Sequence, residues 1–276
     1  MTDLDGQVAW VTGAARGQGR AHALALARAG AHVIVTDIAG QIDTIPYPLG
    51  TSAELEATAA AIADAGGKAT TAVVDVRDAD AVNELVGQVR TDHGRLDILV
   101  ANAGICAFNP VDTMTTAQWD DMVATNLSGT FHCVRAVVSV MKQHRHGRIV
   151  GVSSGAGRGG MRDLSHYAAT KWGIIGFIKS VALEVGAYGI TANVVCPTTV
   201  DTPMVLNPAS LKHFRPDLAN PTADDARAIF AGLSPQGVPW LQPEEVTRAV
   251  MYLVDDPGNT TGSVIEVNLG TSASRA

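Results

Sequence analysis

A glycine-rich turn between an apolar run and a helical stretch constrains the fold of this chain more than any other feature. Val8–Thr12 is a short apolar run, typical of a buried parallel strand. Residues 13–19 then read Gly-Ala-Ala-Arg-Gly-Gln-Gly, and Ala21–Ala29 is a helical stretch rich in Ala and Leu. Strand, glycine turn and helix in this order predict a phosphate-binding loop, because a helix N-terminus offers unpaired N–H groups and a partial positive charge.

The three glycines of this turn have separate structural tasks. Gly13 permits a tight turn, while Gly17 and Gly19 allow backbone and helix to approach a pyrophosphate closely. Arg16 and Gln18 lie between them and are expected to contact the same ligand. The spacing is G-x-x-x-G-x-G and not the G-x-G-x-x-G of the longer dehydrogenases. We therefore expect the same mode of pyrophosphate binding in a different family.

Strand and helix patterns alternate from this turn to the C-terminus, and no linker is long enough to split the chain. The further expected strands are Val33–Asp37, Ala69–Asp75, Leu96–Ala101, Arg148–Ser153, Ile190–Cys196 and Ser263–Asn268. The further expected helices are Thr51–Ala65, Asp78–His93, Thr115–His144, Ser165–Gly186 and Glu244–Asp255. Such alternation predicts the α/β class, with a doubly wound parallel sheet of about seven strands. We expect one domain over residues 1–276.

Composition and charge exclude several classes of protein. Hydrophobic residues make up 46% of the 276 residues and charged residues 17%, which provides enough apolar surface for a sheet covered on both faces. The net charge of -7 argues against nucleic acid or an anionic membrane as a partner. No uninterrupted apolar stretch approaches the length of a membrane span.

Cysteine usage, the N-terminal residues and one basic cluster bear on localisation and metals. Cys106, Cys133 and Cys196 form no C-x-x-C pair, which favours free thiols in a reducing cytoplasm. Residues 1–5 lack the basic and apolar regions of a secretion signal. The basic cluster Lys142–His146 ends an expected helix, where cations are favourable, so we expect no metal site there.

Candidate cofactor residues fall at the C-terminal ends of the expected strands, where ligands bind in doubly wound sheets. Asp37 ends the second strand, followed by Ile38, where an adenosine ribose is expected to lie. A carboxylate accepts both ribose hydroxyls and repels a 2′-phosphate, which favours NAD over NADP, although Arg16 would favour the phosphate. The expected contacts beyond the third and fourth strands are Asp75, Val76, Asn102, Ala103 and Gly104.

Four residues in the middle of the chain are candidates for catalysis. Oxidation of an alcohol requires a base for the hydroxyl proton while the hydride leaves for a nicotinamide ring. Tyr167 is that base if the pKa of its phenol is lowered by about three units from its ordinary value of about 10. This lowering takes about 4 kcal/mol. Lys171 places an ammonium one helical turn away, and the nicotinamide adds positive charge. Ser154 can hydrogen-bond the reacting oxygen, and we assign Asn126 to a proton relay through water.

From end to end, the sequence resembles the short-chain dehydrogenase/reductase family, with its doubly wound Rossmann fold. The motifs that match are the glycine turn, 75–76, 102–104 and the four catalytic candidates. The segment 197–204 also matches, where the family usually reads P-G-x-V-x-T. This resemblance implies a homotetramer. It also implies cofactor contacts by Pro197, Val200, Thr202, Tyr167 and Lys171. Ala101 and Thr198 depart from the family's usual Asn and Gly.

A narrower resemblance comes from the glycine turn and from the loop after the second strand. Strand-to-helix loops usually have a few residues, whereas Ile38–Gly50 is longer. Together with 214–217 and Pro239-Trp240, this loop is similar to that of carveol dehydrogenases and the mycofactocin-coupled group. The resemblance implies oxidation of secondary alcohols such as terpenols with tightly held NAD. We expect the loop to fold over the adenosine half of the cofactor.

The substrate site is expected beneath a lid formed by residues 198–240. The candidate pocket residues are Ser154, Met161, Met204, Phe214 and Trp240. Few charges are available for a carboxylate, so a compact apolar alcohol or ketone is the favoured small-molecule substrate. The expected activity is therefore NAD(H)-dependent interconversion of a secondary alcohol and a ketone. The alternatives are an NADPH-dependent 3-oxoacyl reductase and a non-catalytic NAD-binding sensor.

Overall fold

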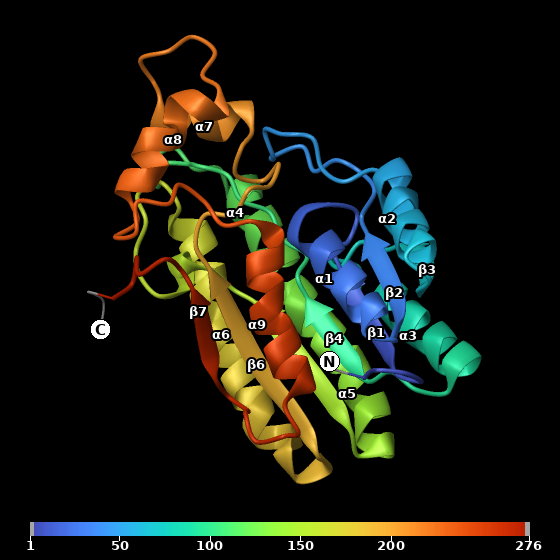
Figure 1. Ribbon diagram of the computed structural model, residues 1–276. Coiled ribbons are helices and arrows are strands. Elements are labelled where there is room, and N and C mark those ends of the chain that lie inside the picture. Colours follow the sequence, from blue (N-terminus) through green and yellow to red (C-terminus); the bar gives the residue numbers. More distant parts are fainter. Residues whose placement is uncertain (1–2, 274–276) are drawn as a thin grey trace.

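Parallel strands form one seven-stranded sheet in the computed structural model, which describes residues 3–273 (Figure 1). The strands are β1 (Val8–Thr12), β2 (His32–Asp37), β3 (Lys68–Val73), β4 (Ile98–Ala101), β5 (Gly147–Val152), β6 (Ile190–Pro197) and β7 (Val264–Val267). Their order is β3-β2-β1-β4-β5-β6-β7, with parallel pairing throughout. The strand order reverses direction between β1 and β4, which confirms the predicted doubly wound sheet.

Helices cover both faces of this sheet. They are α1 (Gly17–Arg28), α2 (Ser52–Asp64), α3 (Ala79–His93), α4 (Thr116–Met122), α5 (Gly129–His144), α6 (Ser165–Val185), α7 (Pro208–Phe214), α8 (Ala223–Gly232) and α9 (Pro243–Asp255). Helices α3, α5 and α6 share a buried apolar cluster with one face, and α1, α2 and α9 share one with the other. Strand β1 shows the alternation, because Val8 and Trp10 join the first cluster while Ala9 and Val11 join the second.

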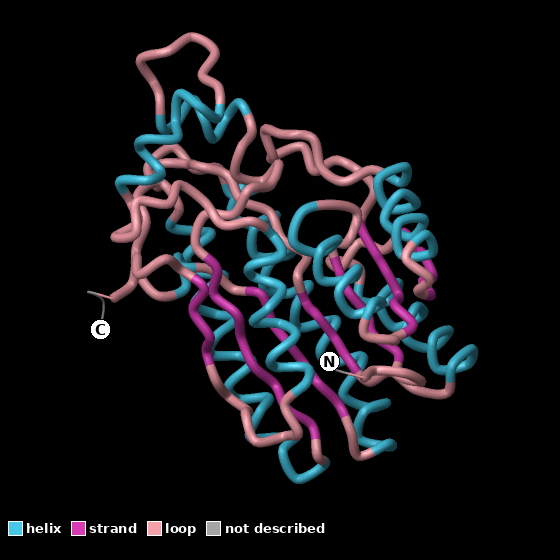
Figure 2. The backbone as a smooth tube through the Cα atoms, in the orientation of Figure 1, coloured by secondary structure: helices cyan, strands magenta, loops and turns pink. Residues whose placement is uncertain are grey.

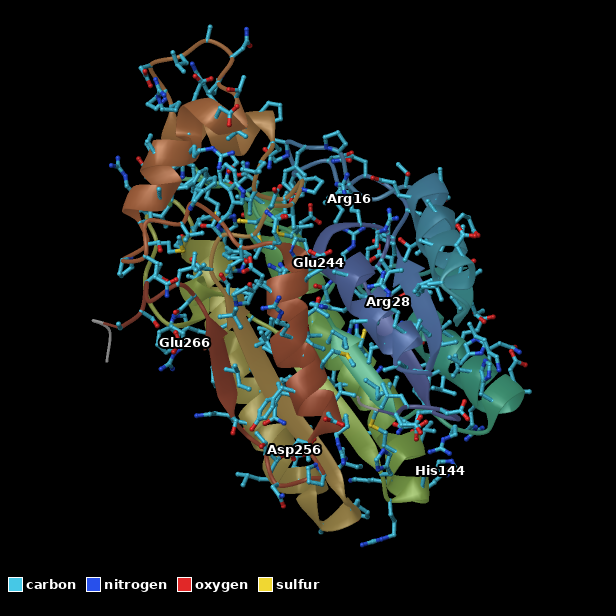
Figure 3. All side chains as sticks on the ribbon, viewed as in Figure 1. Arg16, Arg28, His144, Glu244, Asp256 and Glu266 are labelled. Carbon is cyan, nitrogen blue, oxygen red and sulfur yellow. The ribbon has the colours of Figure 1, made fainter. Side chains whose placement is uncertain are left out.

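The C-terminal ends of the strands lie at the edge of the sheet where long loops and helices α7 and α8 gather (Figures 1 and 2). The loop of residues 38–50 and the segment 198–240 both lie at this edge. Helix α5 ends at the opposite edge, where Figure 3 shows His144 far from Arg16 of the glycine turn. The basic cluster at the end of α5 is therefore remote from the cofactor residues.

One expected helix is divided into three segments. The pattern predicted a continuous helix over Thr115–His144, whereas α4 is followed by a π-helical segment, η1 (Val123–Ser128), and then by α5. Asn126 lies in η1 and hydrogen-bonds the backbone of Ile105 in the loop after β4. Wider turns of this kind are often found at functional sites, and here the wider turn carries a catalytic candidate.

Within residues 3–273, no helix is both long and apolar enough to span a lipid bilayer. In the same residues, no group of His, Cys, Asp and Glu side chains is arranged to hold a metal ion. Cys106, Cys133 and Cys196 are free thiols.

Candidate active site

A cavity opens at the C-terminal ends of the strands and encloses about 1190 Å³ of empty space, part of it open to solvent. Every residue predicted to contact the cofactor lies on its wall: Gly13, Arg16, Gly17, Gln18, Gly19, Asp37, Ile38, Asp75, Val76, Asn102, Ala103, Gly104, Tyr167, Lys171, Pro197, Val200 and Thr202. Ser154 and Met204 line the same cavity. The topology thus brings residues that are far apart in the sequence, from Gly13 to Met204, to one site.

The glycine turn is built for close backbone approach. Gly13 has a φ of +65°, and a Cβ there would lie 2.9 Å from Cα of Ala103. Gly17 has a φ of +57°, and a Cβ on Gly19 would collide with the carbonyl oxygen of Gly13. Helix α1 begins at Gly17 without a side-chain cap, so its first N–H groups point toward the cavity unpaired by a capping side chain. An uncapped helix N-terminus behind three glycines fits a pyrophosphate.

Asn102 holds the glycine turn in position. Its side-chain amide donates to the carbonyl oxygens of Thr12 and Gly13, at 2.9 and 3.1 Å. The hydroxyl of Thr12 in turn accepts from the backbone N–H groups of Asn102 and Ala103, at 3.0 and 2.9 Å. Asn102 therefore ties the end of β4 to the end of β1. Sequence reasoning missed Thr12, whose hydroxyl sits in an otherwise apolar strand.

Asp37 connects the end of β2 to the same turn. Its carboxylate accepts from the backbone N–H of Ala15 at 3.1 Å. Burial raises the pKa of Asp37, while hydrogen bonds from the backbone N–H groups of Ala15, Ala39 and Ile38 and the charge of Arg16 lower it. The carboxylate lies on the cavity wall where the ribose was predicted.

Asp75 is engaged within the protein. Its carboxylate pairs with the guanidinium of Arg77 at 2.7 Å, and Arg77 also reaches Asp121 at 3.2 Å. Asp78, not Asp75, caps helix α3 by accepting from the backbone N–H groups of residues 80 and 81. If the carboxylate of Asp75 contacts an adenine, it does so while it is still paired with Arg77.

Ser154, Tyr167 and Lys171 meet on the cavity wall. The Ser154 hydroxyl lies close enough to Tyr167 to favour a lower phenol pKa, and the Nζ atom of Lys171 lies 5.5 Å from the centre of the Tyr167 ring. The ammonium also donates to the carbonyl oxygen of Val152 at 2.9 Å. Helix α6 supplies Tyr167 and Lys171 one turn apart, and the turn that follows β5 supplies Ser154.

Burial dominates the protonation properties of this group. Burial raises the pKa of Tyr167, and only the Ser154 hydroxyl acts in the lowering direction. Burial lowers the pKa of Lys171 to about 8. The protein environment alone therefore does not lower the phenol pKa, because desolvation outweighs the influence of Ser154.

Asn126 lies behind this group rather than on the cavity wall. It is fully buried, its Oδ1 accepts from the N–H of Ile105 at 2.8 Å, and its Nδ2 donates to Ile105 O and Thr170 Oγ1. A Cβ on Gly104 would lie 3.2 Å from Asn126 Oδ1 and 3.6 Å from Lys171 Nζ. Asn126 therefore positions the loop after β4 beside Lys171. The water relay that the sequence suggested stays a prediction.

Three residues predicted for the substrate pocket lie elsewhere. Met161 is 41% exposed and is not part of the cavity wall. Phe214 and Trp240 each pack against Phe230, with ring centres 4.5 and 5.9 Å apart, in a separate apolar cluster of the lid. These aromatic rings bury one another, so that Met204 is the predicted lid residue that reaches the cavity.

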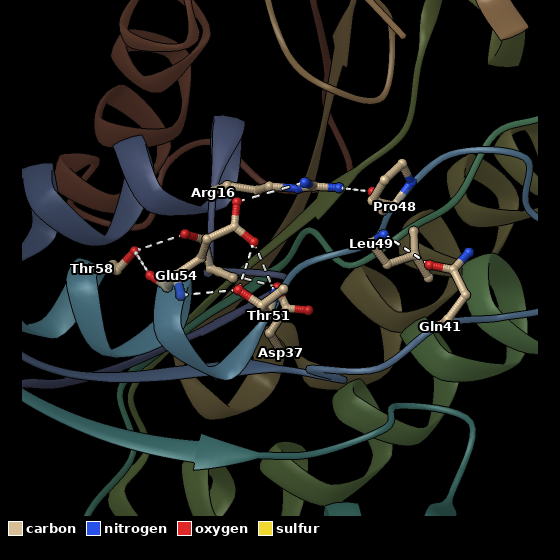
Figure 4. Close-up of polar contacts among 9 residues, drawn as sticks. Arg16, Asp37, Gln41, Pro48, Leu49, Thr51, Glu54 and Thr58 are labelled. Carbon is tan, nitrogen blue, oxygen red and sulfur yellow. Dashed lines mark hydrogen bonds and ion pairs between the residues drawn. The ribbon is translucent and has the colours of Figure 1, made fainter. Parts of the chain in front are cut away.

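The inserted loop contributes more to the cavity than sequence reasoning predicted. Its residues on the wall are Ile38, Ile42, Tyr47, Leu49 and Gly50. The side chain of Gln41 fixes the loop. Its amide nitrogen donates to the carbonyl oxygens of residues 42, 45 and 47. Its oxygen accepts from Leu49 N–H, as Figure 4 shows. The only sequence signal for a role of Tyr47 was an aromatic residue between two prolines.

Arg16 joins the glycine turn to this loop. Its guanidinium donates to the carbonyl oxygen of Pro48 and lies 3.6 Å from the carboxylate of Glu54 (Figure 4). The loop closes against Asp37 at Gly50, where a Cβ would lie 2.9 Å from Asp37 Oδ1. Loop, glycine turn and Asp37 thus form one connected wall of the cavity.

Known proteins with similar sequences and structures identify the family. Residues 7–210 match the family described as short chain dehydrogenase. The chain is 39% identical to a (-)-trans-carveol dehydrogenase of Rhodococcus erythropolis, over 99% of each sequence. It is 36% identical to a 3-oxoacyl-(acyl-carrier-protein) reductase of Escherichia coli, over 97% of this chain and 98% of that protein. Its structure is similar to that of carveol dehydrogenase from Mycobacterium avium in complex with NAD, with a TM-score of 0.96, 38% identity and coverage of 99% and 100%. The chain belongs to the short-chain dehydrogenase family.

Proposed function

We propose that this protein is an NAD(H)-dependent oxidoreductase that interconverts a secondary alcohol and a ketone on a compact apolar substrate, such as a carveol-like terpenol. The meeting of Ser154, Tyr167 and Lys171 with the glycine turn on one cavity wall carries this proposal. The similarity to a carveol dehydrogenase whose structure contains NAD supports the alcohol and the cofactor.

The residues present fit NAD. The uncapped N-terminus of α1 and the glycines at 13, 17 and 19 would hold the pyrophosphate. The carboxylate of Asp37 would accept the adenosine ribose hydroxyls and would repel a 2′-phosphate, which favours NAD over NADP. When bound, NAD supplies the hydride acceptor and a positive charge beside the phenol.

In the direction of oxidation, the side chains around the reacting oxygen hold it and accept its proton. The Ser154 hydroxyl donates a hydrogen bond to that oxygen and sets its distance from Tyr167. Tyr167, in its phenolate form, accepts the hydroxyl proton and becomes the neutral phenol. The ammonium of Lys171 stabilises the phenolate form and is itself held by the carbonyl oxygen of Val152.

A spectrophotometric assay tests this function. Purified protein supplied with NAD should form NADH with secondary alcohols from a panel that includes terpenols. Turnover of 3-oxoacyl thioesters with NADPH in place of the alcohols would instead establish the reductase alternative. Cofactor binding without turnover of either class would establish a non-catalytic sensor.

We propose that the same loop that lines the adenosine side keeps NAD bound for long periods. Pro46 and Pro48 restrict the loop, which lowers the entropy lost when it closes. The contact of Arg16 with the loop and the bonds of Gln41 support this proposal. Cofactor content after purification, and exchange with labelled NAD, test it. Protein that emerges empty and exchanges NAD rapidly contradicts it.

We propose further that the chain is one catalytic domain, with residues 198–240 as its substrate lid, and that it works as a homotetramer in the cytoplasm. Exposed apolar side chains on α5 and α6 support self-association: Phe131, Trp172 and Leu183 are 40%, 49% and 89% exposed. Light scattering with Trp172→Glu tests the assembly. A smaller particle than the native protein is expected, and native protein that runs as a monomer contradicts the proposal.

A further inference from the structure

A second, smaller cavity lies beside the candidate active site. It encloses about 310 Å³ of empty space, part of it open to solvent. Its lining comes from the inserted loop, from the segment after β4 and from the start of the lid: Pro46, Tyr47, Cys106, Ala107, Phe108, Met204, Asn207, Ala209 and Ser210. None of the roles described so far involves this cavity.

The lining of the second cavity is mainly apolar. The side chain of Asn207, its most polar group, is already engaged: its amide nitrogen donates to the carbonyl oxygens of residues 203 and 204, and its oxygen accepts from Ser210 N–H. Phe108, which is part of the lining, stacks on His213 with ring centres 3.9 Å apart. Because no charged side chain lines this space, a hydrocarbon group is the ligand that it suits.

Tyr47 and Met204 line both cavities and therefore stand between them. Tyr47 is 5% exposed, and its hydroxyl oxygen accepts from the backbone N–H of Cys106 at 3.2 Å. This bond fixes the ring against the segment after β4. Met204, from the lid, is an unbranched side chain that changes shape easily.

Tyr47 is also close to the reacting group. It belongs to the same buried cluster as Tyr167, together with Ile105 and Ala107. The two phenols interact electrostatically, and this interaction contributes to raising the pKa of Tyr167. The partition between the cavities thus begins next to the proposed proton acceptor.

We propose that the second cavity is a subsite for the hydrocarbon end of the alcohol, and that Tyr47 of the inserted loop sets how much of that end can enter. The inference rests on the proposed alcohol oxidation. With Tyr47 in place, the two cavities are separate and compact alcohols fit best. Removal of the ring joins the cavities and admits longer ones.

The test compares a series of 2-alkanols of increasing length on NAD-loaded protein. For Tyr47→Ala, kcat/KM should rise with chain length by a factor of about four for each methylene that becomes buried. Tyr47→Phe keeps the ring and should keep the native length preference. Leu49→Ala removes similar bulk from the same loop but from a residue that lines only the first cavity, so it should keep the native preference as well.

A double variant identifies the space that the longer alcohols enter. Ala209 lines the second cavity only, so Ala209→Phe in the Tyr47→Ala background fills that cavity and should cancel the gain. A gain that persists in the double variant, or a Tyr47→Ala protein that keeps the native length preference, overturns the subsite. Measuring bound NAD in each variant separates these results from loss of cofactor.

Failure of the proposed function has a different signature. In that case native protein and variants oxidise none of the alcohols. Calorimetric titration of the NAD-loaded proteins with 2-alkanones of the same lengths then still reports the length preference as binding. A preference that shifts in Tyr47→Ala and returns in the double variant supports the subsite even without turnover, and an unchanged preference refutes it.

Discussion

The two walls of the cavity are held in place by different forces. On the cofactor side, short polar side chains bond to backbone groups: Asn102 holds the glycine turn, and Asp37 accepts from Ala15. On the lid side, the aromatic rings of Phe214 and Trp240 pack against Phe230, away from the cavity. A hydrogen bond to backbone demands a particular side chain, whereas apolar packing accepts many. The cofactor side can therefore be recognised from sequence more readily than the substrate side.

The comparison is tested most severely at Tyr167, where the two walls meet. Tyr167→Phe removes the proton acceptor but keeps the ring, so turnover should fall by at least ~10²-fold. The cofactor wall should be unaffected, and NAD content should stay close to native. The exposed Tyr252 provides the matched control, since Tyr252→Phe should leave turnover unchanged. Comparable activity in the Tyr167→Phe protein would eliminate the mechanism.

A hydrogen bond between α1 and α9 joins the cofactor side to the helix that follows the lid. The hydroxyl of Thr247 donates to Pro243 O at 2.9 Å, so it accepts from Nδ1–H of the fully buried His22 at 2.7 Å. Burial lowers the pKa of His22 from 6.5 to about 3. Below pH 6.5 the unfolded chain binds a proton that the folded protein does not, so stability falls as the pH falls. The free energy of unfolding should be about 2 kcal/mol lower at a pH of about 5 than at neutral pH.

Denaturant unfolding across this pH range measures the effect. His22→Asn should be less stable than native near neutral pH because it lacks the full ring, but its stability should vary less between pH 6.5 and about 5. The exposed His144 serves as control, and His144→Asn should keep the native slope. If the free energy of unfolding changes equally with pH in native and His22→Asn protein, protonation of His22 does not contribute to the pH dependence of stability.

The electrostatic part of the cofactor wall is tested by cofactor choice. Asp37→Ser with Ile38→Arg replaces a carboxylate that repels the 2′-phosphate by a guanidinium that binds it. We expect the ratio of kcat/KM values to move toward NADP by about tenfold or more, since hydrogen bonds to charged groups contribute about 1.5–3 kcal/mol. The same exchange at the exposed Asp43 should leave the ratio unchanged. Native protein that already uses NADPH as well as NADH would contradict the placement of Asp37.

The smallest expected effect concerns the loop that covers the cofactor side. Gln41→Ala removes the four hydrogen bonds that fix residues 42–49, and water replaces part of them because the side chain is near the surface. The lost hydrogen bonds have a net value of about 1 kcal/mol. Exchange of bound NAD for labelled NAD should therefore accelerate about fivefold. Gln88→Ala, on the outer face of α3, is the control. Unchanged exchange would mean that the loop does not retain NAD.

Sequence patterns are most informative where chemistry restricts the residue type. The glycines, Asp37, Tyr167 and Lys171 were chosen because turns, carboxylates and helical periodicity leave few alternatives, and all of them lie on the cavity wall. The seven-stranded doubly wound sheet followed from the alternation of strand and helix patterns and is confirmed. The rise of the phenol pKa in the protein alone was not foreseen, because sequence shows a nearby cation but not the depth of burial; the lowering in the presence of NAD stays a prediction.

Prediction failed where distant segments meet through shape. Phe214 and Trp240 were expected in the pocket because they are aromatic and in the lid, yet Phe230 offers them a better-packed site. Tyr47 was not assigned a role near Tyr167, because no pattern links residues that far apart in the chain. The π-helical segment η1 was missed, since no Pro or Gly interrupts the periodicity within Val123–Ser128.

The segment η1 makes the number of residues in this part of the chain as important as their identity. Each residue turns an α-helix by about 100°. Removing one residue between Val123 and Ser128 would therefore rotate α5 and turn its buried Cys133 and Val137 away from the sheet, or else withdraw Asn126 from Ile105. A surface loop tolerates insertions and deletions. In this stretch, a change in length would displace either the active-site residue Asn126 or the buried face of α5.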